Sequence, residues 1–547
     1  MIKKIFFIGI TLSVLAGCNK DFLDTKPHSA ISSANIWAND KNATMGINGM
    51  YSYLRVEHGF GNFTFRFSIW GPDAIHYNGG GSIPAGSSDA GSGDIERRYK
   101  WPYQIIGRAN DAIGNLTDNP NVTPELRDRF IAEAKFIRGF CYFHLWTLYG
   151  GVIILDKPTP ISESYLPRNT ADEVKEFMIK DFTDAVAGLP VVYPSADDLG
   201  RATKGAAQAM LGKIYLYDKQ WTKAVEELGK LMTAPYTYAL WPKYAELFDF
   251  KTERNTEVIF GVEDISEPGL GSENDVRYGG RSLNGSGWSE TCASWATINA
   301  YTNTDGSTID KSDMPRLSDF GGDDYQLGLA LIPWYQERFK NADKRLLDNV
   351  ILPGYTIKGV NNIEFMMKWP YGEHANDDPY PAYQLDDASK AGIPWRKYIN
   401  VGMESTVRWD SPTNIVLIRF ADILLLWAEA KNEVEGPSQE IYDVINAIRD
   451  RGQVPHISGL SQEDLRTAIR MERFRELPGE GQLFFDVRRW RTASGNDPIF
   501  GLNKEENDFR MERLWTRKFT EKFYLWAIPY DEILMNPKLT QNPGWEQ

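Results

Sequence analysis

The sequence predicts a mainly α protein in which a tetratricopeptide-like helical-repeat scaffold is overlaid by an irregular, loop-rich region. The first observation behind this prediction is a series of segments that carry apolar residues at helix spacing between Gly or Pro breaks. These segments are 102–116, 124–149, 170–189, 203–217, 221–232, 418–434, 438–451 and 462–476. The second observation is that residues 266–335 and 353–415 are rich in Gly, Pro, Asn, Asp and aromatic residues and lack a sustained period. We therefore expect a scaffold at 34–265 and 416–547 and a loop-rich region at 266–415.

One pair of predicted helices fits the tetratricopeptide pattern, which places small residues where two antiparallel helices touch. With Gly212 as the eighth position of the repeat, Ala224 and Leu228 also occupy expected positions. Pro235 lies one residue before the expected closing proline, and Gln208 stands where the pattern has a tryptophan. Close approach of the two backbones explains the small residues, because a bulky side chain would block it. Unrelated helix hairpins with accidental small residues are the alternative.

The composition favours a large core that needs no disulfide support. The 547-residue chain has 42% hydrophobic residues and three cysteines, which excludes collagen-like, disordered and disulfide-scaffold proteins. Its formal net charge is −14. A protein that displaces counterions from phosphates needs a net basic face, so we expect no nucleic acid partner.

The first 33 residues indicate export and lipidation. Lys3 and Lys4 precede an apolar stretch, so residues 1–17 have the form of a signal peptide. The Leu-Ala-Gly-Cys segment that ends at Cys18 resembles the bacterial lipoprotein cleavage box, in which the cysteine becomes the first mature residue and carries acyl chains. We expect Cys18 to enter membrane lipid and residues 18–33 to form a lipidated tether. An ordinary signal peptide with an incidental cysteine is the alternative.

The other two cysteines have a different expected role. Cys141 falls in a stripe of apolar residues at steps of three and four, namely Phe130, Ala134, Ile137, Cys141, Leu145 and Leu148. This spacing predicts a packed thiol on a buried helix face. A bridge between Cys141 and Cys292 stays open, because two cysteines without a spacing motif do not decide the matter.

Aromatic residues make up 13% of the chain, and many of the 17 tryptophans lie in irregular regions. These are Trp70, Trp288, Trp295, Trp334, Trp369, Trp395 and Trp409. A sugar ring has an apolar C–H face and a polar rim, so its binder needs a flat aromatic wall with polar or charged groups at the edge. The candidate glycan-binding residues are Trp70, Asp73, Tyr77, Trp288, Trp334 and Arg396. For any single tryptophan, the alternative is that it packs a loop onto the scaffold.

Catalysis is the competing interpretation, and the sequence does not favour it. A glycosidase needs two carboxylates at a fixed gap, but pairs such as Asp323 with Asp324, or Asp377 with Asp378, are expected by chance among 74 acidic residues. The six histidines show neither metal-binding spacing nor a His-Glu-x-x-His motif. We therefore assign no catalytic residue, metal ligand or cofactor. The loop at 303–313 could hold a structural calcium ion, although it lacks the EF-hand spacing.

Arginines gather near the C-terminus, at positions 470, 473, 475, 488, 489 and 491. Acidic residues are interleaved with them, at positions 472, 476, 480 and 486. We therefore expect an intramolecular ion-pair network at this place and not an anion site.

Sequence blocks along nearly the whole chain resemble the SusD/RagB family of outer-membrane nutrient-binding lipoproteins. In the N-terminal half they are the cleavage box followed by Phe-Leu-Asp at 22–24, Arg-Ala-Asn at 108–110, Ala-Glu-Ala-Lys-Phe-Ile-Arg at 132–138, Tyr-Gly-Gly at 149–151 and Gly-Arg-Ala-Thr-Lys-Gly-Ala-Ala at 200–207. In the C-terminal half they are Glu-Val-Ile-Phe at 257–260, Arg-Phe-Ala-Asp-Ile-Leu-Leu at 419–425, Ile-Asn-Ala-Ile-Arg at 445–449, Asp-Val-Arg-Arg-Trp at 486–490 and Gln-Asn-Pro-Gly-Trp at 541–545. Leu-Pro-Gly at 477–479 departs from a stretch that is usually helical in the family, and Trp-Ala-Ile-Pro at 526–529 replaces a more proline-rich version.

This resemblance implies a scaffold of four tetratricopeptide-like helix pairs and a variable ligand-binding region at 266–415. It also implies a cell-surface lipoprotein of the outer membrane that covers a SusC-like TonB-dependent transporter. The expected function is to capture oligosaccharides without cleaving them and to deliver them to that transporter. Peptide capture in the manner of RagB is the alternative within the family. A protein-binding helical-repeat scaffold and a lipid-anchored glycoside hydrolase are the alternatives outside it.

Overall fold

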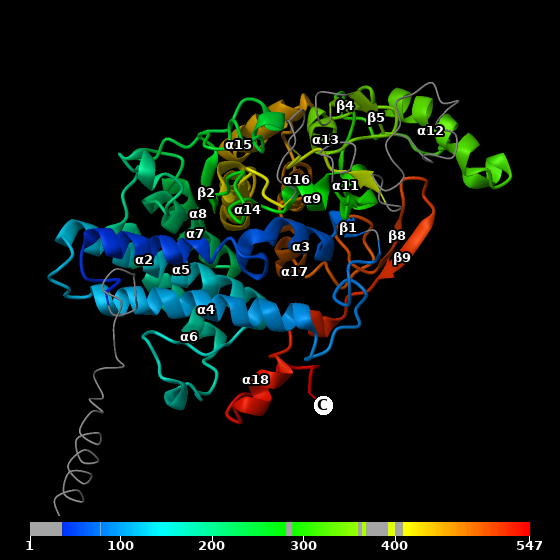
Figure 1. Ribbon diagram of the computed structural model, residues 1–547. Helices are drawn as coiled ribbons and strands as arrows, with labels where there is room; N and C mark the ends of the chain where they lie inside the picture. Colours follow the sequence, from blue (N-terminus) through cyan, green and yellow to red (C-terminus); the bar gives the residue numbers. More distant parts are fainter. Residues whose placement is uncertain are drawn as a thin grey trace, which may run out of the picture.

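The computed structural model describes residues 35–76, 78–279, 287–358, 364–367, 392–399 and 409–546. The predicted signal peptide, Cys18 and the tether therefore lie outside the described residues, and so does Tyr77. Long helices from the first 230 residues occupy one side of the molecule, and most of the short strands and irregular segments, together with the helix at 324–339, occupy the other (Figure 1).

Most of the described regular structure is helical. The helices are α2 (Asp40–Ser52), α3 (Phe63–Trp70), α4 (Gly93–Leu116), α5 (Pro124–Tyr149), α6 (Ala171–Gly188), α7 (Lys204–Tyr217), α8 (Trp221–Lys230), α9 (Asn274–Tyr278), α11 (Trp295–Ala300), α12 (Asp324–Phe339), α13 (Lys344–Asn349), α14 (Phe420–Glu435), α15 (Gln439–Gly452), α16 (Gln462–Glu476), α17 (Gln482–Arg489) and α18 (Tyr530–Met535). The strands are β1 (Ala74–His76), β2 (Val258–Val262), β3 (Thr291–Ala293), β4 (Thr356–Lys358), β5 (Glu364–Met366), β6 (Ile393–Pro394), β7 (Ile415–Arg419), β8 (Lys504–Asn507) and β9 (Arg513–Arg517).

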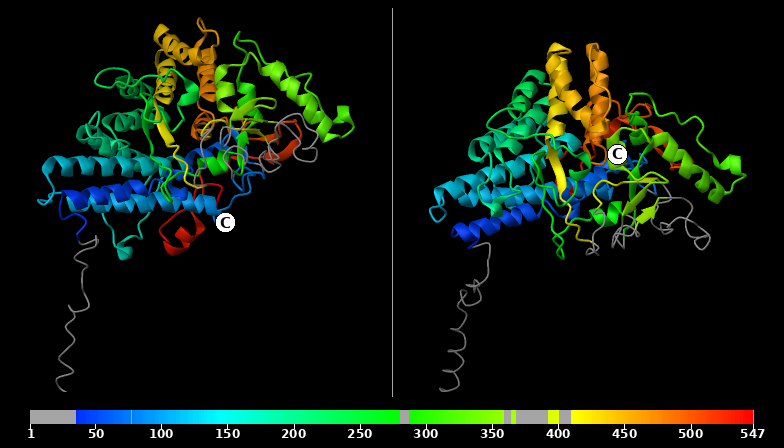
Figure 2. Two further views of the ribbon diagram at one scale, coloured as in Figure 1. Left: turned by 45° about the horizontal axis from the view of Figure 1, so that its top comes forward. Right: turned by 90° about the horizontal axis from the view of Figure 1, so that it is seen from above.

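Neighbouring helices pack in chain order and confirm the predicted helical-repeat scaffold. α4 packs on α5, α5 on α6, α6 on α7 and α7 on α8. The array then continues across the gap in sequence, because α8 packs on α14, which in turn contacts α15 and α16. Both views of Figure 2 show α14, α15 and α16, in yellow and orange, beside the teal helices α7 and α8.

Gly212 allows the close approach of α7 and α8 that the repeat pattern predicts. A Cβ atom added at Gly212 would lie 2.5 Å from Leu228 Cγ and 3.1 Å from the backbone nitrogen of Leu228. Ala224 and Leu228 are fully buried at this contact. The small residue is therefore required by the distance between the two helices.

Short antiparallel sheets connect segments that are distant in sequence. β1, β3 and β6 form a three-stranded sheet in the order β1-β3-β6, with Ile75 opposite Cys292. β2 pairs with β7 and so joins the two halves of the scaffold, with Val262 opposite Ile415. β4 pairs with β5, and β8 with β9.

The predicted packing of Cys141 is confirmed. Both Cys141 and Cys292 are buried and neither forms a disulfide, so the bridge that the sequence left open is absent among the described residues. Burial raises the pKa of the Cys141 thiol, which makes a thiolate at this position unfavourable.

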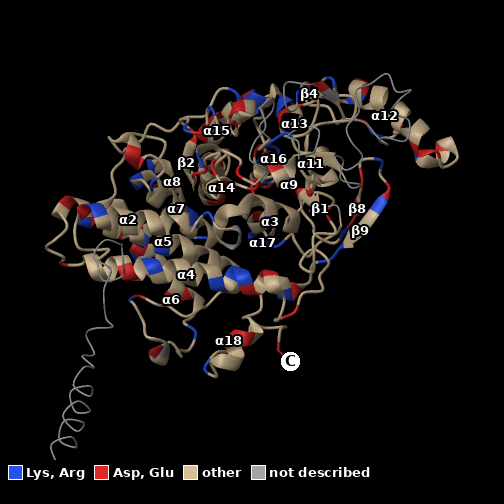
Figure 3. Cartoon of the chain, viewed as in Figure 1, with Lys and Arg blue, Asp and Glu red and all other residues tan. Residues whose placement is uncertain are grey.

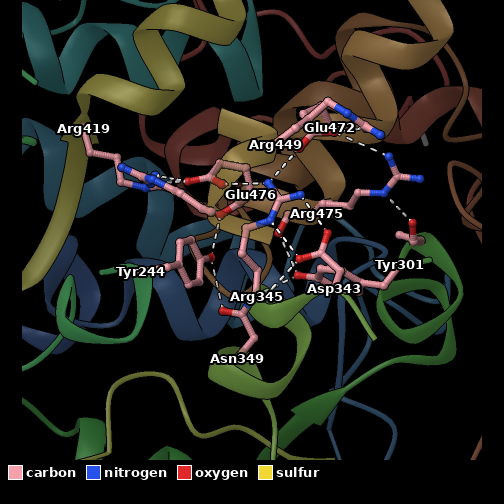
Figure 4. Close-up of polar contacts among 12 residues, drawn as sticks. Tyr244, Tyr301, Asp343, Arg345, Asn349, Arg419, Arg449, Glu472, Arg475 and Glu476 are labelled. Carbon is pink, nitrogen blue, oxygen red and sulfur yellow. Dashed lines mark hydrogen bonds and ion pairs between the residues drawn. The ribbon is translucent and has the colours of Figure 1, made fainter. Parts of the chain in front are cut away.

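A buried ion-pair network joins the loop-rich region to the scaffold (Figure 4). Arg345, on α13, binds Glu472 and Glu476 of α16 at 2.7 and 3.0 Å. Arg419, at the end of β7, binds Glu476 at 2.8 Å, and Arg449 of α15 binds Glu472 at 3.0 Å. These contacts connect α13, β7 and α15 to α16 through Glu472 and Glu476, two of the acidic residues that the sequence interleaves with its C-terminal arginines.

A second buried cluster confirms the ion-pair network predicted for the C-terminal arginines. Arg473 binds Asp486 at 2.7 Å, and Arg489 binds Glu429 and Asp486 at 2.5 and 2.9 Å. Charges of both signs are interspersed along the helices in Figure 3. In the part of the chain that the structure describes, no helix has both the length and the apolar character that crossing a membrane requires.

Candidate functional site

The candidate site is built on α9, a short helix at the start of the region predicted to bind ligand. The segment before β3 runs beside this helix. The amide of Trp288 donates to the carbonyl of Val276 at 2.8 Å, and the amide of Glu290 donates to the carbonyl of Arg277 at 2.8 Å. These two backbone bonds bring Trp288 and Glu290 next to Arg277.

A second pairing brings a tryptophan from a distant segment to the same helix. Ser272, just before α9, and Ser411 exchange backbone hydrogen bonds of 2.9 and 2.8 Å. Trp409 therefore lies against Trp288, with ring centroids 5.0 Å apart and an interplanar angle of 87°. Trp288 is half-buried, whereas 39% of Trp409 is exposed. Together the two indole rings form an aromatic corner that reaches the surface.

The guanidinium of Arg277 lies against both rings of this corner. Its guanidinium carbon lies 5.7 Å from the ring centroid of Trp288 and 6.0 Å from that of Trp409, within the range of a cation–π contact. Two carboxylates hold the guanidinium in place, Glu290 at 2.5 Å and Glu273 at 2.9 Å. Because the side chains of Arg277 and Glu290 are each only 12% exposed, the group is fixed before any ligand arrives.

A neutral histidine lies next to this group. Strand β1 places His76 opposite Thr291, the residue after Glu290. Burial and the charge of Arg66 lower the pKa of His76 to about 4, so its imidazole is uncharged at neutral pH. The net polar character of the corner therefore comes from Arg277 and its two carboxylates.

This arrangement suits a ligand with a flat apolar face and a polar rim. An exposed indole ring offers apolar area and a π-face, while carboxylate oxygens at its edge accept hydrogen bonds from hydroxyl groups. Each such hydrogen bond contributes about 1 kcal/mol net, because hydroxyl groups are already bonded to water. The chemistry of the corner is thus that of reversible binding.

Two of the residues predicted to bind ligand lie in the core instead. Trp70 is 1% exposed, and its ring packs 5.2 Å from Phe67 and 5.4 Å from Trp526. Asp73 is fully buried, and its Oδ2 accepts a 2.8 Å hydrogen bond from the amide of Gly479. The prediction is corrected for both residues, since neither presents a surface to a ligand in this structure. Trp70 was grouped with Asp73 and Tyr77 because the three are close in sequence. Closeness in sequence was misleading here, because α3 ends at Trp70 inside the aromatic core.

The other predicted residues lie away from the aromatic corner. Trp334, on α12, is 9% exposed and donates its indole N–H to Asp313 at 3.0 Å. Arg396 pairs with Asp348 at 3.4 Å and lines a separate small pocket of about 90 Å³ together with Tyr244. Tyr77 lies outside the described residues. Of the five candidates that the structure describes, Trp288 alone lies at the corner.

Sequence reasoning missed the residues that complete the corner. Trp409 was noted only as a tryptophan in an irregular region, and Arg277 and Glu273 were not singled out. The spacing of Glu273 and Arg277, four residues apart, is a helix ion-pair signal that could have marked them. Nothing local marks Trp409, because its position depends on the pairing of Ser411 with Ser272.

The acidic residues considered from the sequence for hydrolysis or calcium binding contact other groups of the protein where they are described. Asp323 caps α12 by accepting from the amides of Tyr325 and Gln326, and Asp324 pairs with Arg510 at 2.5 Å. Asp377 and Asp378 lie outside the described residues. Asp305 accepts a backbone hydrogen bond within the loop proposed for calcium. Across the described ranges, no group of three or more His, Cys, Asp or Glu side chains is placed to hold a metal ion.

The fold and the corner together define a helical-repeat protein with a partly exposed aromatic corner on its irregular side. The model of the SusD family matches residues 256–545, more than half of the chain. A second model, described as starch-binding associating with outer membrane, matches residues 21–216. The chain belongs to the SusD family.

Relatives and solved structures agree with this assignment. SusD-like protein P25 of Formosa agariphila is 25% identical over 96% of this chain and 95% of its own length, and SusD-like protein P2 of the same organism is 26% identical over 99% of both. A SusD-like carbohydrate-binding protein from Bacteroides fragilis superposes with a TM-score of 0.75 at 25% identity, covering 92% of this chain and all of that one. A laminarin-binding SusD-like protein superposes with a TM-score of 0.66 at 23% identity, covering 92% of this chain and 99% of its own.

Proposed function

We propose that this protein is a non-enzymatic glycan-binding lipoprotein of the cell surface, which captures oligosaccharides for uptake. The observation that carries the proposal is the exposed Trp288–Trp409 corner, held by Arg277 and its two carboxylates. An apolar sugar face can stack on Trp409, while Glu273 and Glu290 lie at the edge for its hydroxyl groups. The names of the carbohydrate-binding and laminarin-binding relatives support the same class of ligand.

The N-terminal sequence and the family support the place of action that we propose. Acylated Cys18 would hold the chain in outer-membrane lipid, and residues 18–33 would form the tether between the lipid and the scaffold. The description of the second family model, which includes association with the outer membrane, supports this location. The partner that receives the captured oligosaccharide would be a SusC-like TonB-dependent transporter.

The direct test is retardation of the purified protein in gels that contain laminarin, starch or a panel of plant, host and microbial glycans. At least one glycan should retard the wild type. Trp288→Ala and Trp409→Ala should each weaken the retardation at least 10-fold, which corresponds to about 1.4 kcal/mol. Tyr530→Ala is the matched control, because Tyr530 is an exposed aromatic residue (51%) on α18, away from the corner.

The same experiment separates the alternatives. New reducing ends in the incubated glycan would identify a hydrolase and contradict the proposal. Binding of peptides in place of every glycan would identify peptide capture, which depends on backbone pairing and charged pockets more than on aromatic walls. Equal retardation of the wild type and both tryptophan variants would show that ligand binds elsewhere.

A further inference from the structure

A second pocket lies among the helices of the scaffold, and no residue of the Trp288–Trp409 corner lines it. It has a volume of about 320 Å³ and lies where the C-terminal ends of α5, α7 and α17 meet the segment around Tyr524. Its lining includes the aromatic residues Trp146, Tyr217 and Tyr524. It also includes three arginines, Arg488, Arg489 and Arg491. The volume is at the lower end of the range for small-molecule sites and is suited to one sugar-sized ring.

Two of these arginines are neutralised by carboxylates. Arg489 binds Glu429 and Asp486, and Asp486 also binds Arg473. Arg491, at the rim, pairs with Glu521 at 2.7 Å, and both side chains are more than half exposed. Neither of them requires a further anion.

Arg488 differs, because no carboxylate pairs with it among the described residues. It is 5% exposed, and one Nη donates to the carbonyl oxygen of Tyr524 at 2.6 Å. Its Nε is buried without a hydrogen-bond partner, and its other Nη has no hydrogen bond within the described ranges. The titratable groups around it are Tyr217, Tyr524, Tyr149 and Arg491, none of which is a carboxylate, and burial lowers the pKa of Arg488 to about 10. A buried guanidinium without an anion is costly, and an anion in the pocket would offset that cost.

The aromatic residues that line the pocket beside Arg488 indicate which other chemical group a bound anion should have. Arg491 covers the ring of Tyr524 at 3.5 Å, and Arg489 lies 5.4 Å from the centroid of Tyr217. The half-buried Trp146 remains as a wall for an apolar ring face. A guanidinium fork matches the two oxygens of a carboxylate, and an indole face matches the C–H face of a sugar.

We propose that this pocket binds a uronate, that is, a sugar ring whose carboxylate pairs with Arg488 and whose apolar face lies on Trp146. The pocket is separate from the Trp288–Trp409 corner, so this proposal does not depend on the function proposed for that corner. The sequence predicted no anion site among the C-terminal arginines. That prediction holds for Arg473 and Arg489 but does not account for Arg488.

Calorimetry with sodium glucuronate, glucose and sodium acetate tests the proposal. We expect glucuronate to bind at least 10-fold more tightly than either glucose or acetate. Arg488→Gln should weaken glucuronate binding at least 10-fold. Arg470→Gln is the matched control and should bind as the wild type, because Arg470 also has no ion pair among the described residues and lies over an aromatic ring, Trp490 at 4.9 Å, but does not line the pocket.

A second variant covers the case in which Arg488→Gln does not fold. Leu525 is 37% exposed and lines the same pocket, so Leu525→Trp should fill the pocket from the surface and abolish glucuronate binding without disturbing the buried arginine. The Trp288→Ala and Trp409→Ala variants should still bind glucuronate. The proposal is overturned if glucuronate does not bind the wild type, if glucose or acetate binds equally well, or if Leu525→Trp and a folded Arg488→Gln retain the wild-type affinity.

Discussion

At the scale of single residues, Asp73 combines full burial with incomplete hydrogen bonding. Its Oδ2 accepts from Gly479, whereas its Oδ1 has no hydrogen-bond partner in the described part of the chain. Burial raises the pKa of Asp73 from 3.8 to about 6, although the bond from Gly479 acts in the opposite direction. The folded protein therefore favours the protonated form of this carboxyl group more strongly than the unfolded chain does.

This pKa shift predicts a pH-dependent effect of Asp73→Asn. The folded state keeps its proton up to about pH 6, while the unfolded chain loses it near pH 3.8, so the free energy of unfolding falls by about 3 kcal/mol as pH rises through this window. Asparagine does not titrate, so the variant should gain stability relative to the wild type between pH 4 and pH 7.5. Urea unfolding at both pH values measures the difference. A stability difference that is the same at both values would contradict this assignment, and glycan retardation should be unchanged.

Glu476 shows the opposite behaviour. Burial alone would raise its pKa, but the charges of Arg451, Arg419 and Arg345 outweigh that effect and lower the pKa to about 2. Its contribution to stability is therefore complete above its ordinary pKa of 4.5 and is lost as pH falls toward 2. Removal of one partner from a buried ion pair costs about 3–5 kcal/mol.

Glu476→Gln should accordingly lower the free energy of unfolding by about 3–5 kcal/mol at pH 7, and this loss should shrink as pH falls from 4.5 to 2. Equilibrium urea unfolding over this range measures the effect. Glu521→Gln is the control, since Glu521 is 68% exposed in its pair with Arg491 and should change stability by less than about 1 kcal/mol. A loss at pH 7 that is no larger than that of the control would show that the network does not stabilise the fold.

At the scale of secondary-structure elements, two glycines inside helices differ in whether an added side chain would meet a neighbouring helix. Gly212 faces Leu228 across the α7–α8 contact, whereas a Cβ atom added at Gly107 in α4 would meet nothing within 4 Å. Gly212→Ala should therefore destabilise the protein by about 1–3 kcal/mol, because the helices must move apart. Gly107→Ala should stabilise it by about 0.5–1 kcal/mol through lower entropy of the unfolded chain. Thermal unfolding of both variants measures the contrast, and a stabilising Gly212→Ala would exclude the close approach.

Helix prediction succeeded where apolar spacing was long and uninterrupted. The predicted helices at 124–149 and 462–476 have the same limits as α5 and α16. The predicted start at residue 102 was too late, because α4 begins at Gly93 and continues through Pro102, a residue that normally marks a helix start. α12, which contains Pro333, lies in a region that the composition predicts to be irregular. In both cases a proline within a helix misled the local pattern.

At the scale of the whole molecule, the scaffold is formed by two parts of the chain that the loop-rich region separates in sequence. The β2–β7 pair and the α8–α14 contact close this gap. The buried pairs of Arg345 with Glu472 and Glu476 then hold α13, from the loop-rich region, against α16, and the Arg419–Glu476 pair holds β7 against the same helix. Such long-range contacts cannot be found from periodicity, which reports one segment at a time. Trp288 was a candidate from the sequence. Trp409 became one only in the structure, because its place depends on the long-range pairing of Ser411 with Ser272.

The central claim is that the Trp288–Trp409 corner holds carbohydrate, and calorimetry tests it most directly. The titrant is the oligosaccharide that corresponds to the glycan that retards the wild type most strongly, and the proteins are the wild type, Trp409→Ala and Tyr530→Ala. We predict at least a 10-fold loss of affinity in Trp409→Ala and none in Tyr530→Ala, with all three proteins equally stable. Wild-type affinity in a folded Trp409→Ala protein would contradict the claim.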